Sequence, residues 1–263
     1  MDMKRVLSIA GTDPTGGAGM QADIKTITAH KMFAMSVVTA LVAQNTMGVY
    51  GVIDTPPEFV GQQMDCVMND IFPDAVKIGM VSSPAIIEKI VEKLKEYQPG
   101  HIVVDPVMVS TSGGKLLSDD AMDALIGKLI TMAEVITPNI PEAEVLCGGS
   151  FEIRCWDDMV KAAEQISTFY KGNILIKGGH LEDSSDDLLY HDGKVIRFAG
   201  ERVDNPNTHG TGCTLSSAIA CNLAAGKSVE ESIREAKSYI TDALKANLNL
   251  GKGRGPLNHC CRM

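Results

Sequence analysis

The sequence predicts an α/β fold with a mostly parallel central sheet. Short apolar runs rich in valine and isoleucine alternate with longer amphipathic segments through most of the 263 residues. These runs are nearly continuous rather than alternating, which is typical of parallel strands covered by helices on both faces. The chain is 44% hydrophobic and 22% charged, which is enough for a buried core. Because no linker, repeat or low-complexity segment interrupts the pattern, we expect a single domain over residues 1–263.

The individual elements follow in order along the chain. Buried strands are expected at 6–11, 36–44, 75–80, 101–108, 133–139 and 173–179. Helical patterns fall between them, for example at 83–97 and 156–170. Asp192-Gly193 lies between two short runs and predicts a β-hairpin, because this dipeptide favours a tight turn. Two further helices are expected to begin near Cys213 and Val229. Alternation of this kind predicts a doubly wound sheet with right-handed crossovers.

Charge and cysteine usage narrow the classes of function. The net charge of −9 and the pI of about 5.1 argue against nucleic acid as a partner, although such a surface can still hold a local anion site. The seven cysteines include no C-x-x-C, and the N-terminal apolar run is too short for a signal peptide, so we expect a reduced, cytoplasmic setting. No apolar stretch approaches the roughly 20 residues of a membrane span, and we expect no membrane partner.

A polar or contact side chain lies at, near or just after the end of each expected strand. These residues are Asp13, Gln44, Met80, Asp105, Asn139 and Lys177. The carboxyl ends of parallel strands meet at one edge of a sheet, where ligands bind. The charges of Asp105 and Lys177 are costly at the ends of buried strands unless they are paired, bound to metal or exposed in a cleft. The pattern therefore predicts a ligand site at this edge.

Two glycine motifs allow other interpretations. "AAGKS" (224–228) lacks the first glycine of the Walker pattern and follows a helix, so a P-loop is rejected. "GAGMQA" (17–22) fits the dinucleotide fingerprint, but Gln44 replaces the expected acid, which leaves a nucleotide-binding fold as a minor alternative. The surrounding loop is either a plain connection or a segment whose backbone approaches a ligand, with Asp13 or Asp23 hydrogen-bonding it.

Two helix starts also have both a structural and a functional interpretation. In "NIPE", Asn139 and Glu142 form a capping box, or Glu142 holds a water of a magnesium ion. In "HGTGC", the glycines at 210 and 212 would let an anion reach the unpaired N–H groups of a helix N-terminus. The same field is expected to lower the pKa of Cys213 and make the thiol a base or nucleophile. The alternative is a glycine turn with a small packing cysteine.

Seven segments, taken together, carry a family resemblance between about residue 5 and about residue 258. They are "SIAGTDPTGGAGMQADIKT", "TALVAQNTMGV", "KIGM", "VVDPVMVSTSG", "ITPNIPEAEVL", "IKGGH" and "NTHGTGCTLSSAIA". In this order they closely resemble the hydroxymethylpyrimidine/phosphomethylpyrimidine kinases, which have a ribokinase-like fold. The resemblance implies a three-layer α/β/α architecture, ATP and Mg²⁺ as cofactors, and a homodimer.

The resemblance also implies roles for individual residues. The pyrimidine pocket falls on Gly11, Asp23, Gln44, Met80 and Val107. The anion hole falls on Gly210, Thr211 and Gly212, with Cys213 as the catalytic base. The magnesium and nucleotide-phosphate positions fall on Asp105, Asn139, Glu142 and Lys177, with Lys237 as a weaker match. The chain departs from the family at Arg254, where histidine is usual, and in the acidic segment 182–187.

The implied activity is ATP-dependent phosphorylation of 4-amino-5-hydroxymethyl-2-methylpyrimidine, and then of its monophosphate, in thiamine biosynthesis. Pyridoxal kinase is the first alternative; the amide of Gln44 favours the pyrimidine because it can pair with an aminopyrimidine edge. The second alternative is a non-catalytic vitamin- or nucleotide-binding regulator. The intact set of Asp105, Lys177 and Cys213 argues against it.

Overall fold

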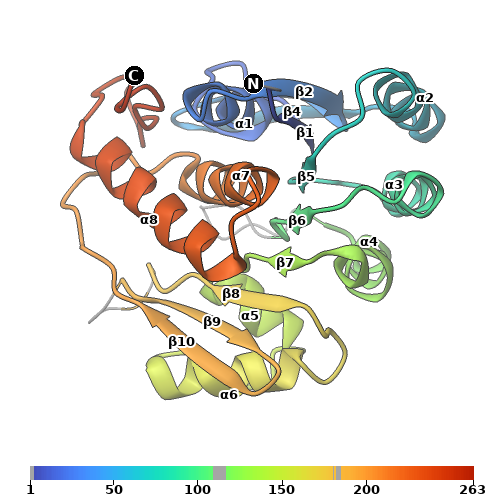
Figure 1. The fold of residues 1–263 in the computed structure, drawn as a ribbon. Helices are drawn as coiled ribbons and strands as arrows, with labels where there is room; N and C mark the ends of the chain where they lie inside the picture. Colours follow the sequence, from blue (N-terminus) through green and yellow to red (C-terminus); the bar gives the residue numbers. More distant parts are fainter. Residues whose placement is uncertain (1–2, 109–116, 180, 182–184) are drawn as a thin grey trace.

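The computed structural model describes residues 3–108, 117–179, 181 and 185–263. In this part of the chain an eight-stranded sheet has the order β10-β9-β8-β7-β6-β5-β1-β2 (Figure 1). Six strands run parallel: β1 (Arg5–Ala10), β2 (Phe33–Val38), β5 (Ala75–Ile78), β6 (Ile102–Val104), β7 (Val135–Ile136) and β8 (Asn173–Ile176). The mostly parallel sheet is therefore confirmed.

The predicted hairpin forms one edge of this sheet. Strand β9 (Asp187–His191) pairs antiparallel with β8 on one side and with β10 (Lys194–Phe198) on the other. Asp192 and Gly193 both have positive φ, 47° and 78°, as a two-residue turn that matches strand twist requires.

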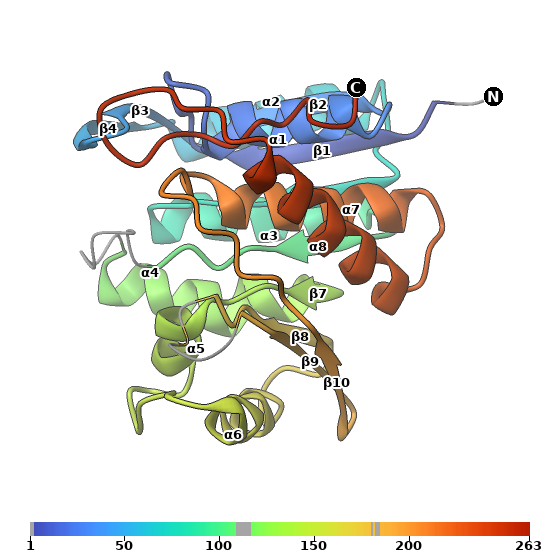
Figure 2. The same ribbon diagram turned by 90° about the vertical axis from the view of Figure 1, so that its left-hand side faces the viewer.

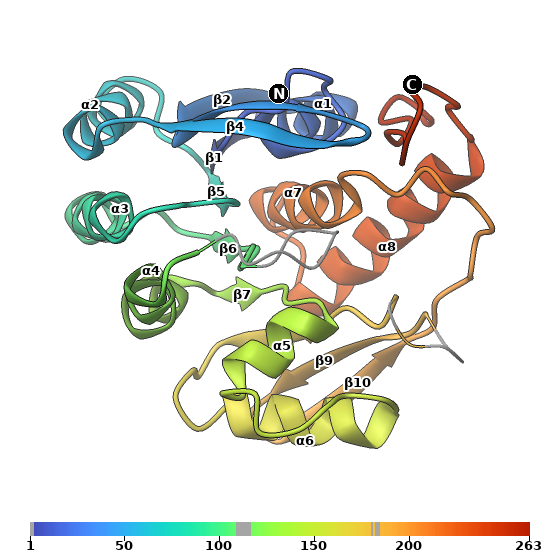
Figure 3. The same cartoon turned by 180° about the vertical axis from the view of Figure 1, so that it is seen from behind.

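Helices cover both faces of the sheet, so the three-layer α/β/α architecture is also confirmed (Figures 1 and 3). One face carries α2 (Pro57–Met68), α3 (Pro84–Tyr97), α4 (Asp119–Ala124), α5 (Ile140–Leu146) and α6 (Trp156–Ile166). The other carries α1 (Gly19–Ala29), α7 (Thr211–Ala224) and α8 (Val229–Lys245). The strands supply both cores: Ile102 and Val104 pack on the first face and Val103 on the second.

Helix starts follow the local sequence. The Ser83 hydroxyl accepts a hydrogen bond from the N–H of Ile86 and caps α3. Ser228 and Glu231 form a reciprocal capping box at the start of α8. A π-turn (Leu125–Leu129) and a 3₁₀ turn (Ile130–Met132) continue α4. Within the described residues, no helix has both the length and the apolar character to cross a bilayer.

The expected strand 36–44 is wrong as a single element. The chain leaves the main sheet at Thr39, whose hydroxyl donates to the carbonyl of Met80 (2.8 Å). Residues beyond it form β3 (Ala40–Asn45), which pairs with an unpredicted β4 (Gly48–Asp54) in a separate two-stranded sheet. Every residue of β4 is exposed, so the burial that our strand pattern relied on is missing there. Figure 2 shows this hairpin beyond the carboxyl ends of the parallel strands.

The other strands are also shorter than predicted. The runs 101–108, 133–139 and 173–179 contain the strands β6, β7 and β8, but their last residues leave the ladder. Proline at 106 and 138 explains two of these early ends, because proline cannot donate to a sheet. Part of the motif that follows Val107, and part of the acidic segment 182–187, lie outside the described residues.

Candidate active site

The carboxyl ends of neighbouring strands are joined by main-chain hydrogen bonds into one continuous edge. The Asp105 N–H donates to the carbonyl of Ile78, and the Lys177 N–H donates to the carbonyl of Pro138, both at 2.9 Å. Asn139 and Lys177 then form a parallel bridge beyond the ends of β7 and β8. The structure thus brings Asp105, Asn139 and Lys177 together, as predicted for residues at the carboxyl ends of parallel strands.

Lys177 pairs with two carboxylates at this edge. Its Nζ lies 2.8 Å from Asp105 Oδ1 and 3.9 Å from Glu142 Oε2. The hydroxyl of Thr137 also donates to Asp105 Oδ1 (3.0 Å). Burial alone would lower the pKa of Lys177, but the charges of Asp105 and Glu142 hold it above its usual value. Burial opposes ionisation of Asp105 as well, yet nearby lysines, Lys177 first, keep its pKa low.

Glu142 is a buried carboxyl group with too little positive charge around it. Burial raises its pKa to about 7, Lys177 opposes that rise, and the charge of Asp105 adds to it. One oxygen accepts from the N–H of Asn139 (2.8 Å), while the Asn139 side chain accepts from the N–H of Glu142 (2.9 Å). The capping box is therefore confirmed, and it fixes Glu142 beside Lys177 at the end of the sheet.

The "HGTGC" stretch starts α7 without a side-chain cap. Gly210 is the N-cap at φ 83°, and a Cβ there would collide with the carbonyl of Gly17. A Cβ on Gly212 would lie 3.2 Å from Asp105 Oδ2 and 3.3 Å from Lys177 Nζ. Because Gly212 has no side chain, Asp105 and Lys177 can approach the helix N-terminus closely, and such a terminus attracts anions.

Cys213 follows in the same turn, but its expected low pKa is wrong for this structure. Burial raises the pKa of the thiol to about 11, because desolvation penalises a thiolate. The charge of Lys77 and the N–H of Gly19 oppose this rise, and the charges of Asp23 and Asp105 add to it. The helix N-terminus alone therefore does not activate the thiol, and residues outside the turn decide how readily it ionises.

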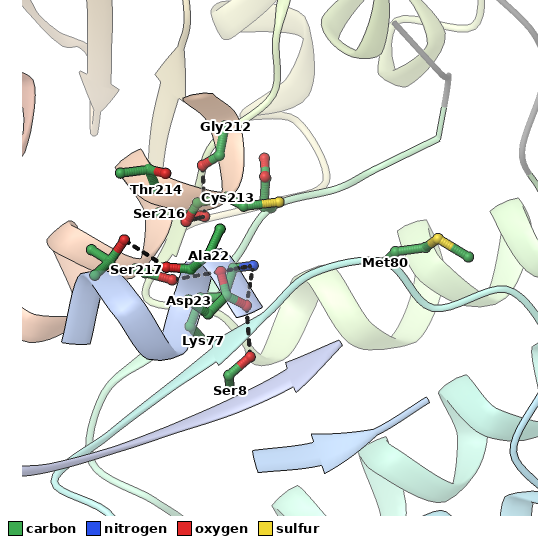
Figure 4. A network of polar contacts seen from close by, with 12 residues as sticks. Ser8, Ala22, Asp23, Lys77, Met80, Gly212, Cys213, Thr214, Ser216 and Ser217 are labelled. Carbon is green, nitrogen blue, oxygen red and sulfur yellow. Dashed lines mark hydrogen bonds and ion pairs between the residues drawn. The ribbon is translucent and has the colours of Figure 1, made fainter. Parts of the chain in front are cut away.

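A fully buried ion pair lies beneath this turn and includes a residue that our sequence interpretation missed. Lys77 Nζ donates to both oxygens of Asp23 at 2.9 Å, and neither side chain is exposed. Ser8 and Ser217 also donate to Asp23, at 2.6 and 2.8 Å (Figure 4). A lysine inside the apolar run "AVKIGM" was the available signal, since a buried charge needs a partner. The resemblance predicts that Asp23 contacts the substrate; in this structure its carboxylate is buried and accepts hydrogen bonds from Lys77, Ser8 and Ser217.

Asp13 is likewise held by hydrogen bonds within the protein. It accepts from the N–H groups of Thr15, Gly17 and Ala18, and His209 Nε2 lies 2.8 Å from it. Burial opposes its ionisation, but these hydrogen bonds, that with His209 first, keep its pKa well below the usual value. The pair joins the loop after β1 to the residue preceding Gly210, a connection between distant segments that no sequence pattern revealed.

The other expected pocket residues lie around the same edge. Gly11 faces the hairpin, where an added Cβ would lie 3.6 Å from Val42 Cγ2. Gln44 is half-buried on the more enclosed side of β3, after a bulge at Ala43. Met80 and Val107, both partly exposed, follow β5 and β6. These residues therefore lie around the carboxyl edge of the sheet.

Lys237 lies farther away, on α8. Its Nζ is 2.5 Å from Asp187 Oδ2 and 3.0 Å from the carbonyl of Ser185. Asp187 also accepts from the N–H of Gly178, the residue after Lys177 (2.9 Å). Lys237 lines a cavity of about 420 Å³ between α8 and β10. The hydrogen bonds of Gly178 and Lys237 to Asp187 therefore connect the strand edge at Lys177 with this cavity.

Three features thus occur together: an open helix N-terminus, a lysine beside it and a pair of buried carboxylates, all at the carboxyl edge of a parallel sheet. This arrangement is typical of the site of a phosphoryl-transfer enzyme. The chain belongs to the phosphomethylpyrimidine kinase family, whose model matches residues 13–258.

Characterised relatives cover nearly all of the chain. It is 43% identical over 262 residues to the hydroxymethylpyrimidine/phosphomethylpyrimidine kinase of Escherichia coli, covering 98% of both chains. It is 46% identical over 255 residues to the thiamine biosynthesis bifunctional protein ThiED of Geobacter sulfurreducens, of which it spans 52%. It spans 35% of a similar multifunctional ThiED protein from Corynebacterium efficiens.

Solved structures agree with this fold. The phosphomethylpyrimidine kinase from Clostridium difficile is 46% identical, with a TM-score of 0.82, covering 91% of this chain and 99% of that one. The pyridoxal kinase from Staphylococcus aureus in complex with AMP-PCP is 33% identical, with a TM-score of 0.91, covering 99% of this chain and 95% of that one. The fold is therefore ribokinase-like, and the minor dinucleotide-fold alternative is rejected.

Proposed function

We propose that this chain uses ATP to phosphorylate 4-amino-5-hydroxymethyl-2-methylpyrimidine and then the resulting monophosphate. The observation that carries the proposal is the close approach at Gly212, where an added Cβ would lie 3.2 Å from Asp105 Oδ2 and 3.3 Å from Lys177 Nζ, in the turn that holds Cys213. An anion site and a proton acceptor in one turn suit transfer of a phosphoryl group to an alcohol. The names of the relatives support the same substrate. ADP release with the pyrimidine alcohol, ATP and Mg²⁺ tests the proposal; none above background from folded protein contradicts it.

In the first reaction, the N–H groups of Gly212 and Cys213 and the ammonium of Lys177 bind the transferred phosphoryl group. They stabilise the charge that develops on its oxygens. The Cys213 thiolate accepts the hydroxyl proton as the alcohol oxygen forms its bond to phosphorus and the bond to ADP breaks. The alternative is that Cys213 only packs in a glycine turn, and turnover of the Cys213→Ala variant distinguishes the two roles.

In the second reaction, the acceptor is a phosphate oxygen. A phosphate monoester is ionised at neutral pH, because its second pKa is about 6, so this acceptor needs no strong base. The first product must place its phosphate near the position of the former hydroxyl, which brings more negative charge to the edge. The α7 N-terminus and Lys177 are the groups positioned to offset that charge.

Asp105 and Glu142 fit a magnesium site. Both are buried carboxylates that share Lys177, and burial raises the pKa of Glu142 to about 7, a rise that a bound cation would oppose. No group of three or more acidic, histidine or cysteine ligands occurs in the described ranges, which suits an ion that keeps waters and phosphate oxygens as ligands. When bound, Mg²⁺ would neutralise charge on the phosphates of ATP. Asn139 holds Glu142 in place for this contact.

Gln44 supports the pyrimidine over pyridoxal as the substrate. It lies on the enclosed side of the hairpin that faces Gly11, and its amide can both donate to and accept from an aminopyrimidine edge. Met80 and Val107 would border the ring. The likeness to pyridoxal kinases keeps pyridoxal as the alternative substrate, and the coupled assay with both alcohols separates the two.

Assembly and setting complete the proposal. The β3–β4 hairpin exposes Leu41 (57%), Met47 (62%), Tyr50 (69%) and Ile53 (71%). Such a concentration of apolar side chains marks an interface, and we assign it to a homodimer.

The seven cysteines are all free, which suits a cytoplasmic enzyme. Because the two cores share one sheet, we also propose that residues 1–263 form a single domain.

A further inference from the structure

Lys77 is the largest fully buried side chain of the described chain, and the mechanism above does not use it. Burial, the largest single effect, would lower its pKa, but the charges of Asp23, Cys213 and Asp105, with the hydrogen bonds to Asp23, together outweigh burial and raise it. The side chain therefore stays an ammonium ion inside the protein. A permanent buried charge costs free energy, so its position calls for a functional explanation as well as a structural one.

Four residues hold this ammonium in place. Asp23 accepts two hydrogen bonds from it and is itself fixed by the hydroxyls of Ser8 on β1 and Ser217 on α7. Gly79 supplies the space: a Cβ at that position would lie 2.7 Å from Lys77 Nζ. These hydrogen bonds thus fix the position of the ammonium between the sheet and α7.

This arrangement directs the charge toward the catalytic turn. Ser217 follows Cys213 by four residues on α7, so both lie on the same face of the helix, one turn apart (Figure 4). On that face the Ser217 hydroxyl donates a hydrogen bond to Asp23, and Lys77 donates to the same carboxylate.

The charged groups that act on Cys213 come from four elements. The charge of Lys77 on β5 lowers the pKa of the Cys213 thiol. This effect is larger than the increase caused by Asp23 on α1 or by Asp105 after β6. The thiolate in turn raises the pKa of Lys177 at the end of β8. The N–H of Gly19, at the start of α1, also favours the thiolate. Lys77 is therefore the principal cation that favours ionisation of Cys213.

We propose that Lys77 is a positioning residue, which Asp23 orients so that its ammonium stabilises the Cys213 thiolate before proton transfer. The inference rests on the proposed role of Cys213 as the base. The thiolate takes the proton of the alcohol and becomes a thiol. That proton then leaves to solvent, and Lys77 remains an ammonium ion throughout. The ion pair thus acts on the first reaction, because only that acceptor must lose a proton.

The direct test is the rate at which iodoacetamide alkylates Cys213, followed by mass spectrometry of the modified peptide between pH 7 and pH 9. Below its pKa the thiol reacts in proportion to its thiolate fraction. We expect Lys77→Met to slow Cys213 at least about tenfold, since loss of a nearby opposite charge shifts a pKa by about one unit or more. Equal rates in wild type and a folded Lys77→Met protein would overturn the proposal.

Cys221, buried on the same helix, is the internal control for loosened packing. Lys77 is not among the charges that act on it, so its slow alkylation should not change. If Lys77 only supported the fold, its loss would expose both thiols and speed both reactions, and that result also overturns the proposal. Because alkylation is measured without substrate, it reports the coupling even if Cys213→Ala later shows that Cys213 is not the base.

A second variant covers the case in which the single variant does not fold. Lys77→Met combined with Asp23→Leu removes the buried pair as a unit, a change that proteins often tolerate. The proposal expects Cys213 to react more slowly than in wild type, because the lost cation acts more strongly than the lost anion. A rate equal to or faster than wild type contradicts it. In turnover assays, Lys77→Met should lower kcat for the alcohol much more than kcat for the monophosphate, a split that a general loss of folding would not produce.

Discussion

Cys213 is a thiol whose surroundings oppose its own ionisation. Its pKa of about 11 means that the resting side chain is protonated at neutral pH. The charge of Lys77 keeps this pKa from rising further. A thiol can act as a base only in its thiolate form, whose fraction grows tenfold with each pH unit below the pKa. The chemistry of the first reaction therefore depends on a minor ionisation state.

This dependence predicts different pH profiles for the two reactions. With the alcohol as acceptor, kcat should rise steadily from pH 7 toward pH 10, because the thiolate fraction rises while the pKa of about 11 is not yet reached. With the monophosphate, kcat should be nearly flat over the same range, since that acceptor is already ionised. Initial rates with each acceptor at saturating ATP measure both profiles. A flat profile for the alcohol, with chemistry rate-limiting, would show that no thiolate is required.

Gln44 is predicted to determine which ring is phosphorylated. An amide that pairs with a ring edge disfavours analogues that leave it unpaired. Gln44→Met should therefore lower kcat/KM for the pyrimidine alcohol by about 10- to 100-fold, the scale of a lost hydrogen bond to substrate, and should affect pyridoxal less. Gln62→Met, the same change at an exposed position on α2, is the control. Equal losses on both substrates would reduce Gln44 to a supporting role.

At the scale of elements, the start of α7 is the part that the account depends on most. Gly212 is helical and has no positive φ, but a Cβ there would enter the space beside Asp105 and Lys177. Gly212→Ala should therefore reduce turnover of both acceptors by at least about 100-fold, a scale seen when an oxyanion donor is lost. The melting temperature should change little. Gly100→Ala, where nothing lies within 4 Å of the added Cβ, is the matched control. Near-normal turnover in Gly212→Ala would move the phosphoryl site elsewhere.

Elements also show what sequence patterns can and cannot reveal. The parallel strands, the Asp192-Gly193 hairpin and the starts of α7 and α8 were predictable, because local periodicity, turn chemistry and caps determine them. The β3–β4 hairpin was not, since its exposed strands lack the apolar continuity of a buried strand. Asp105 and Lys177 could be found as charges at buried strand ends. Lys77 could have been found in the same way, but its partner Asp23, 54 positions away, could not.

The raised pKa of Cys213 illustrates a different limit. A helix N-terminus is visible in a sequence, whereas the burial that outweighs its field depends on how α1, α7 and the strand ends pack together. The same holds for Asp13, for which the sequence left a ligand role open and whose pairing with His209, 196 positions away, depends on the tertiary fold. Motifs thus located the site, and tertiary packing decided the roles and ionisation of its members.

At the scale of the whole molecule, the exposed hairpin predicts the assembly. Wild-type protein should sediment as a homodimer at micromolar concentration if Leu41, Tyr50 and Ile53 lie in the interface. Ile53→Arg should shift the equilibrium to the monomer, because a charge in the centre of an apolar interface is strongly unfavourable. Val195→Arg, at another partly exposed apolar position on β10, is the control and should leave the dimer intact. A monomeric wild type would contradict the assignment.

The most direct test of the whole account is a comparison of initial rates with the alcohol and the monophosphate for wild type, Cys213→Ala and Lys177→Ala. Loss of the base should cut the first reaction by about 10²–10⁴, the usual scale for acid–base catalysis, and leave the second much less affected. Loss of Lys177 should damage both reactions, because both transfer a phosphoryl group through the same anion site. Wild-type activity on both acceptors with this pattern is the predicted result. Equal damage to both reactions in Cys213→Ala, or no reaction of the wild type with the monophosphate, would contradict the account.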